Sequence, residues 1–330
     1  ILRDPEPIDR ADMVLMESTY GGRRHRSRDE TVAELGEILT SRRSRKGNIL
    51  IPAFSIGRSQ EILYQLGKHY EEWELDRFRI FLDSPMAIEA TQIYWHYPHL
   101  YDEEATRLRR ENGGMPLLPN LSLRRSPDDS MAINRIRSGA IVIAGSGMCN
   151  GGRIIHHLKH NLDRAETQIL ITGYQAYGSL GRRLVDGQSA VRNHGRDIPV
   201  RASDHTVAGP SAPGDQDDLA SWYENMENRP PVYLVHGEVE AQQDFQAYLS
   251  GRCGAEVHLP KPGDVLDLAT LKEAPWGRPS GHVARKRPPT AGGLQQDTRG
   301  RPERPVDRNR PPAPDGIKEV PTGRKSMPDA

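Results

Sequence analysis

The stretch IVIAGSGMCNGGRIIHHLKHN at residues 141–161 decides how the rest of the chain is interpreted. It begins with a short apolar run at residues 141–144, continues through a turn with four glycines, and ends with helical spacing of Ile154, Ile155 and Leu158. This order predicts a strand, a loop and a helix. Free N–H groups and the positive dipole at the beginning of such a helix favour an anion, most often a phosphate.

The side chains of this turn suit phosphate binding, although no common nucleotide-binding motif fits. Ser146 supplies a hydroxyl and Arg153 a guanidinium. A Walker loop requires a Gly-Lys-Ser/Thr ending, and a dinucleotide fingerprint requires glycine where the chain has Asn150. Two histidines have the spacing of a zinc-protease helix, but His157 occupies the position of its glutamate base. A phosphate-binding loop and a plain structural turn remain as alternatives.

The same alternation of strand, loop and helix continues along the chain, which predicts an α/β fold with a largely parallel sheet. We expect strands at residues 11–17, 48–54, 78–82, 141–144, 168–172, 199–202 and 232–235. We expect helices after the cap Asp29 and at residues 58–73, 86–95, 127–138, 154–161, 215–225 and 240–250. Ligands of parallel sheets bind beyond the carboxyl ends of the strands, where Ser55, Asp83, Ser146 and Gln175 would gather.

Charge is distributed unevenly along the 330 residues. The chain has 45 Lys and Arg residues against 45 Asp and Glu residues, yet residues 277–330 hold 12 basic and 6 acidic ones. The segment from residue 273 also holds 11 of the 26 prolines and has no apolar periodicity. We therefore predict a disordered Pro/Arg-rich tail at residues 273–330, which either attracts nucleic acid or serves as a solvated linker.

Cysteine content and hydropathy indicate the compartment. Cys149 and Cys253 are the only cysteines, too few for a disulfide framework or a cysteine zinc site, so we expect a reducing cytoplasm. No apolar run approaches the roughly 20 residues of a membrane helix, and we expect no membrane partner. The chain begins at Ile1 with a strand that ordinarily needs earlier strands as neighbours, so we expect the front of a domain to be missing.

Six stretches together resemble the β-CASP branch of the metallo-β-lactamase superfamily, the RNA-processing nucleases that include RNase J and the nuclease of pre-mRNA 3′-end cleavage. They are MESTYGGRRH (16–25), IPAFSIGRSQEILY (51–64), DSPMA (83–87), AGSGMCNGGRIIHHLKH (144–160), GYQAYGSLGRRL (173–184) and LVHGE (234–238). The resemblance implies a β-CASP α/β domain inserted in a partial metallo-β-lactamase αββα sandwich. The implied segments are a trailing strand at 1–19, the β-CASP domain at 20–195, the second sandwich part at 196–272 and the tail.

The resemblance also implies roles for particular residues. Glu17 corresponds to a motif carboxylate that supports the catalytic centre, and His236 to a catalytic histidine that ligates or adjoins two zinc ions. The implied RNA contacts are Ser146, Gly147, Arg153, His157, Arg58 and Ser55. The implied partner is RNA, which we expect to be single-stranded.

Taken alone, several of these residues have structural alternatives. Glu17 could be a surface carboxylate and His236 a satisfied core histidine. Arg58 either caps its own helix or holds an RNA phosphate. Tyr174 and Tyr177 either stack on a base or pack against the protein.

Two departures from the family pattern bear on activity. The chain contains no His-x-His-x-Asp-His zinc motif, and residues 211–215 read Ser-Ala-Pro-Gly-Asp, where Pro213 replaces a motif histidine. His205 is too distant to substitute for it. We therefore predict a zinc-dependent RNA-processing phosphodiester hydrolase in a truncated or catalytically impaired form, which pairs with its missing half or forms a homodimer. The alternatives are a non-catalytic RNA-binding or scaffold subunit and an unrelated enzyme that binds a nucleotide at residues 145–152.

Overall fold

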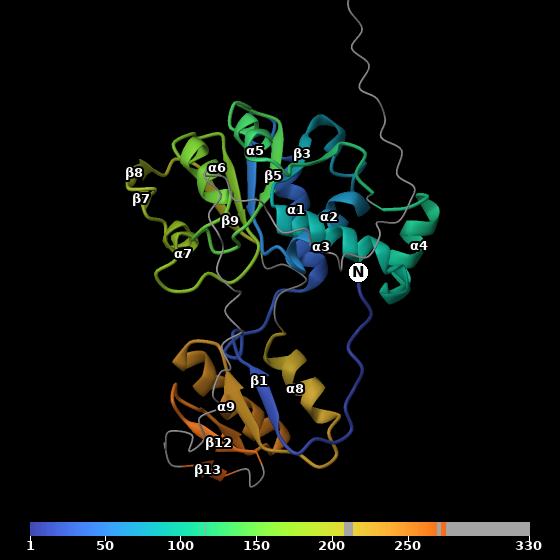
Figure 1. Ribbon diagram of the computed structural model, residues 1–330, viewed down its shortest axis with the longest axis vertical. Coiled ribbons are helices and arrows are strands. Elements are labelled where there is room, and N and C mark those ends of the chain that lie inside the picture. The colour runs from blue at the N-terminus through green and yellow to red at the C-terminus, as the bar shows by residue number, and fades with distance from the viewer. Residues whose placement is uncertain (116, 208–213, 269–271, 275–330) are drawn as a thin grey trace, which may run out of the picture. The chain divides into compact units, whose positions relative to one another are not determined.

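The computed structural model describes residues 1–115, 117–207, 214–268 and 272–274, of which the last three are described by their backbone only (Figure 1). The predicted tail at 273–330 therefore lies almost entirely outside the described residues. Pro213, which the sequence places at the position of a motif histidine, also lies outside them.

A six-stranded sheet forms the larger part of the described fold, and all its neighbouring strands are parallel. The strand order is β4 (Leu121–Leu123), β3 (Arg79–Leu82), β5 (Ala140–Ala144), β2 (Ile49–Pro52), β6 (Gln168–Ile171) and β9 (Ser203–Thr206). Parallel strands need crossover connections, which helices provide here. This arrangement confirms the predicted α/β class with a parallel sheet.

Helices cover both faces of this sheet (Figure 1). Ile49 and Ile51 point to one face, where they join a core with α1 (Arg28–Thr40), α2 (Arg58–Lys68) and α3 (Pro85–His96). Leu50, between them, points to the opposite face. There the core includes residues of α5 (Pro127–Ile133), α6 (Ile154–Asn161) and α7 (Leu180–Val185). Burial on both sides explains why the strands β2 and β5 are apolar throughout rather than alternating.

Local capping chemistry sets where the helices begin. Ser27, rather than the predicted Asp29, caps α1: its side chain accepts from the N–H of Glu30, whose carboxylate accepts from the N–H of Ser27. Asp29 lies in the first turn instead, where its charge suits the helix dipole. Ser84 caps α3, and Pro85 takes its first helical position.

A second, three-stranded parallel sheet contains β1 (Val14–Glu17), β10 (Val232–Val235) and β11 (Val257–His258). The helices α8 (Gln216–Glu224) and α9 (Val239–Cys253) pack against it through one apolar cluster. Because β1 pairs directly with β10, the whole six-stranded sheet is inserted between two neighbouring strands, as predicted. The inserted sheet continues past residue 195, since β9 pairs with β6.

The remaining elements show where patterns in the sequence were insufficient. The strand predicted at 199–202 is wrong: a hairpin of β7 (Ala190–Asn193) and β8 (Arg196–Pro199) precedes β9. The structure adds α4 (Glu103–Glu111) and ends α2 at Lys68. Short 3₁₀ turns and an antiparallel pair complete the described elements: Leu75–Arg77, Pro98–Leu100, β12 (Val265–Asp267) and β13 (Lys272–Ala274).

Candidate nucleic-acid interface

The loops that follow four parallel strands meet at the carboxyl end of the six-stranded sheet. The Ser55 hydroxyl lies 3.3 Å from the Ser84 hydroxyl, and Gln175 Nε2 donates to the Gly147 carbonyl at 2.9 Å. This meeting of the loops in two bonded pairs agrees with their expected position at one edge of the sheet. It follows from the strand order, which places β2 and β5 side by side at the centre of the sheet.

The glycine loop, residues 145–152, holds itself together with backbone hydrogen bonds. The N–H of Ile154 donates to Gly145, and the N–H of Ser146 donates to Gly151, at 2.9 and 3.1 Å. Gly152 has φ +67°, and a Cβ there would collide with the Gly145 carbonyl. The N–H groups of Ser146 and Ile154 are thus engaged within the loop. They are not the free phosphate donors that the sequence pattern suggested.

Asp83 organises the region beneath the glycine loop. This fully buried carboxylate accepts from Arg153 Nη1 at 2.7 Å, from His157 Nε2 at 2.6 Å and from Ser130 Oγ at 2.6 Å. Burial alone would raise the pKa of Asp83, but the hydrogen bonds from His157, Ser130 and Arg153 lower it on balance. The carboxylate therefore joins β3, α5 and α6 as a buried charge.

Two of the expected RNA contacts belong to this network. His157 is completely buried, and its second ring nitrogen lies 2.9 Å from the Asn134 side-chain oxygen. Arg153 also donates to the carbonyls of Arg124 and Arg125. Because their polar atoms are already engaged, Arg153 and His157 position the loop in this structure rather than face a ligand.

Arg58, at the first position of α2, has a different environment. It is 6% exposed, and no hydrogen bond or ion pair joins its guanidinium to any residue that the structure describes. Burial lowers the pKa of Arg58, while the nearby Tyr20 and Glu61 oppose that shift. The alternative that Arg58 caps its own helix is not supported, since α2 begins without a side-chain cap. A buried cation of this kind is suited to an anionic ligand.

Glu17 and His236 lie at the ends of adjacent strands. Glu17 is in register with Val235, and the Ser18 hydroxyl bonds the carbonyls of Val235 and His236 at 3.1 and 2.9 Å. One carboxylate oxygen of Glu17 accepts from Thr19 N–H at 2.7 Å. The other is buried and has no partner among the described residues. The strand pairing brings together two motif residues that are far apart in the sequence.

A cleft of about 670 Å³, which we call the first cleft, is lined by both Arg58 and His236 but not by Glu17. Its lining combines a cation, a carboxylate, aromatic rings and other polar and apolar groups: Thr19, Phe54, Arg58, Met148, Tyr174, Tyr177, His236 and Glu238. Tyr174 Oη donates to Glu238 at 2.6 Å, and burial together with this carboxylate raises the pKa of Tyr174 to about 12. The ring of Tyr177 is 90% exposed, so it is accessible to a planar ligand.

The described residues do not fit a zinc ion. Over 1–115, 117–207, 214–268 and 272–274, no group of three or more His, Cys, Asp or Glu side chains comes together as a metal site. A zinc site needs at least three protein donors, and His236 with the unpartnered Glu17 oxygen supplies at most two.

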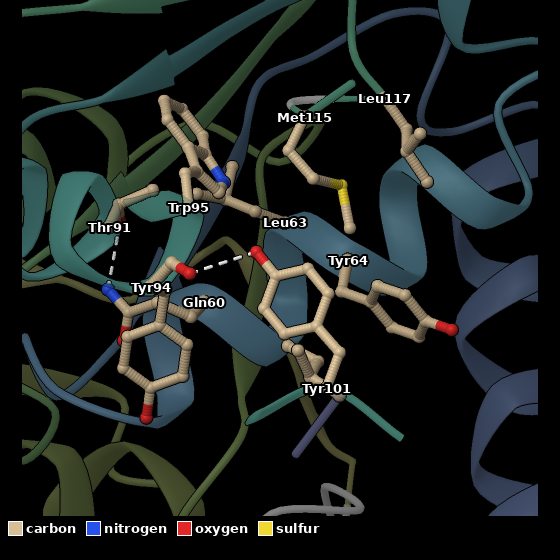
Figure 2. A pocket seen from close by; sticks show the side chains of 10 residues that line it. Gln60, Leu63, Tyr64, Thr91, Tyr94, Trp95, Tyr101, Met115 and Leu117 are labelled. Atoms are coloured by element: carbon tan, nitrogen blue, oxygen red, sulfur yellow. Dashed lines mark hydrogen bonds between the residues drawn. The ribbon is translucent and has the colours of Figure 1, made fainter. Parts of the chain in front are cut away.

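Another cavity is too small to hold a substrate (Figure 2). Its volume is about 20 Å³, roughly the space of one water molecule. The polar groups beside it bond within the protein: Tyr101 Oη donates to the Tyr94 carbonyl at 2.9 Å, and Gln60 Nε2 to Thr91 Oγ1 at 2.8 Å. This cavity is part of the packed interior.

The chain matches two protein families in succession. Residues 59–184 match the Beta-Casp domain, and residues 197–260 match the Zn-dependent metallo-hydrolase RNA specificity domain. Together with the inserted parallel sheet, these matches define the class of protein: an α/β chain with a β-CASP domain, followed by an RNA specificity domain of Zn-dependent metallo-hydrolases.

Similar proteins support the same class. The chain is 41% identical to a Ribonuclease TTHA0252 of Thermus thermophilus over 81% of its own length and 61% of that relative. It is 29% identical to the Transcription termination factor FttA of Methanocaldococcus jannaschii, over 78% of the chain and 42% of the relative. An RNase J-like protein of the same organism is 26% identical over 79% of the chain and 60% of the relative. The chain belongs to the β-CASP family of the metallo-β-lactamase superfamily, a family of RNA-processing hydrolases. It spans about 40 to 60% of the length of these relatives.

No described helix is long and apolar enough to cross a membrane.

One contact in the wall of the first cleft had no signal in the sequence. Phe54 lines the first cleft beside Gly147, where a Cβ would lie 2.7 Å from the Phe54 ring. A glycine facing an aromatic ring across two distant loops left no signal in either segment.

Proposed function

We propose that this chain binds single-stranded RNA in the first cleft, as the RNA-holding part of a zinc-dependent phosphodiester hydrolase. Arg58 carries the proposal, because it is a buried cation in the cleft wall without a described partner. An RNA phosphate would supply the missing charge-assisted hydrogen bonds. Tyr177 and Phe54 offer rings for base stacking, which favours single-stranded RNA since its bases can splay out.

We place the catalytic centre beside Glu17 and His236. His236 lines the cleft, and Glu17 ends the neighbouring strand with one unpartnered oxygen. We assign Glu17 a positioning role and His236 a role next to the scissile phosphate. Ser55, Ser146 and Gly147 shape the adjacent wall, since Ser55 and Gly147 belong to the loops that meet there.

RNA affinity of an Arg58→Gln variant tests this proposal. We expect the Kd for a labelled oligouridylate to rise about 10-fold or more, because a charge-assisted contact is lost without a compensating group. Arg58→Lys should retain part of the affinity, since it keeps the charge but not the planar fork. The matched control is Arg110→Gln, which removes an exposed arginine at the end of α4.

Thermal unfolding of both Arg58 variants must accompany the binding measurement, because the residue is buried. A well-folded Arg58→Gln protein with unchanged RNA affinity would refute the proposal. An equal loss in Arg110→Gln would also count against it, since it would indicate nonspecific charge attraction.

A non-catalytic RNA-binding subunit is the second candidate, favoured by the lack of a three-donor metal group among the described residues. Zinc content and RNA cleavage of the full chain separate the two functions. Stoichiometric zinc with cleavage above background supports the hydrolase, whereas RNA binding without either supports the subunit. The other expected partner is a second copy of the chain. Sedimentation equilibrium measures whether such a homodimer forms. The cytoplasmic location is proposed on the two free cysteines.

A further inference from the structure

A second cleft adjoins the first and is lined by arginines. Its volume is about 320 Å³, and its lining includes Arg23, Arg24, Arg26 and Arg182 but no carboxylate among the residues described. We call it the arginine cleft. Gly173 and Tyr174 line both clefts, so the two share one wall.

The shared wall is a set of packed aromatic rings. Tyr20 packs edge-on against Tyr174 at 6.0 Å between ring centroids and against His25 at 4.6 Å. The guanidinium of Arg23 lies over the Tyr20 ring at 5.6 Å, while Tyr20 is also close enough to Arg58 for each to affect the pKa of the other. Arg23 and Arg58 therefore lie around the same tyrosine, one in each cleft.

The arginines of this cleft differ in how far their charge is neutralised. Arg24 pairs with Asp217 at 2.7 Å, and Arg26 and Arg182 also pair with carboxylates outside the lining. Arg23 is exposed and has no ion pair with a described residue. All three ion pairs leave both side chains at least a third exposed, so a polyanion can compete for these arginines.

We propose that the arginine cleft is a second RNA-binding site, which holds the phosphates of the strand as it leaves the first cleft past Tyr174. This inference rests on the proposed function and extends it to longer RNA. A shared aromatic wall with a cation on each side suits consecutive nucleotides of one single strand. Arg23 is the principal phosphate contact, and Arg182 contributes as a second cation of the same lining.

Binding of two labelled oligouridylates to the full chain tests the inference, one of about 4 nucleotides and one of about 12, a range that single-strand sites cover. We expect Arg23→Gln to weaken the longer probe about fivefold and to leave the shorter probe unchanged. The slope of log Kd against log salt concentration for the longer probe should fall by about 0.7 for one lost contact. Arg182→Gln should act in the same direction, and Arg110→Gln is the charge-matched control.

The possible outcomes separate this inference from the proposed function. If the wild type binds the longer probe and both Arg23→Gln and Arg182→Gln match the control, the RNA-binding role of the arginine cleft is refuted. The proposed function of the first cleft is then unaffected. Equal weakening of both probes by Arg23→Gln also overturns it, because the contact would then belong to the first cleft. If neither probe binds the wild type, the proposed function and the arginine cleft are both refuted.

Discussion

Replacing Asp83 with asparagine tests whether the buried network determines the stability of the inserted domain. The substitution keeps the shape of the side chain but removes its charge and turns one acceptor into a donor. That new donor takes the place either of the oxygen that accepts from Arg153 or of the oxygen that accepts from His157 and Ser130. The guanidinium of Arg153 then loses its only carboxylate partner among the described residues.

The expected loss of unfolding free energy in Asp83→Asn follows from the burial of the ion pair. Asp83 is fully buried and the Arg153 side chain is 18% exposed, so solvent screens this pair poorly. Removing one member of a buried pair costs about 3–5 kcal/mol. A typical domain has about 5–15 kcal/mol of unfolding free energy, so the variant should lose a large part of its stability. Asp197→Asn, which breaks an exposed pair with Arg192, should have no measurable effect.

Urea unfolding followed by circular dichroism measures the effect, and its pH dependence tests the cause. The native pKa of Asp83 is lowered, so its contribution is present above the unfolded pKa of about 3.9 and is lost as pH falls through the native value. The difference in unfolding free energy between the wild type and Asp83→Asn should therefore be largest at neutral pH and should decrease below about pH 4. A loss under about 1 kcal/mol at neutral pH would contradict the predicted cost of the broken pair.

Two further predictions concern glycines and thiols. Gly152→Ala should destabilise the protein by at least about 1–2 kcal/mol in thermal unfolding, since alanine would need φ +67° and would collide with Gly145. Gly251→Ala is the matched control: a Cβ there meets nothing within 4 Å inside α9, so it should stabilise by about 0.5–1 kcal/mol, and a loss of similar size at both sites would contradict the reasoning. For the thiols, we expect an aromatic disulfide reagent at about pH 8 to modify Cys253 slowly and to spare Cys149, because burial raises the pKa of Cys149 to about 12. Rapid modification of two thiols in the native protein would show that Cys149 is accessible, whereas both should react after denaturation.

The sequence predicted the parallel sheet well because the relevant signal is local. Residues 49–52 and 140–144 are short apolar runs followed by loops that contain serine and glycine, and burial on both faces requires apolar strands. The strand predicted at 199–202 failed because pairing there depends on partners elsewhere in the sequence. Residues 196–199 pair with the preceding hairpin strand, and residues 203–206 pair with β6.

The candidate site was less predictable, since it depends on where charges find partners. Arg153, His157 and Arg58 look alike in sequence as basic residues near loops. Only the fold shows that Asp83 engages the first two and that Arg58 remains without a described partner. Arg23 and Tyr20 carry no individual signal, because their relation to Tyr174 arises from loops about 150 residues apart in sequence.

The pairing of β1 with β10 has a consequence for synthesis on the ribosome. The Ser18 hydroxyl bonds a carbonyl that lies 217 positions later in the chain. The pairing of β1 with β10 can therefore form only after the inserted domain has been synthesised. Bringing such distant ends together costs loop-closure entropy, unless an already folded insert holds them close. The backbone of His25 and the Asp215 carboxylate, 2.9 Å apart, show that the two junctions of the insert do meet. We therefore expect the insert to fold first during translation and the three-stranded sheet to close last.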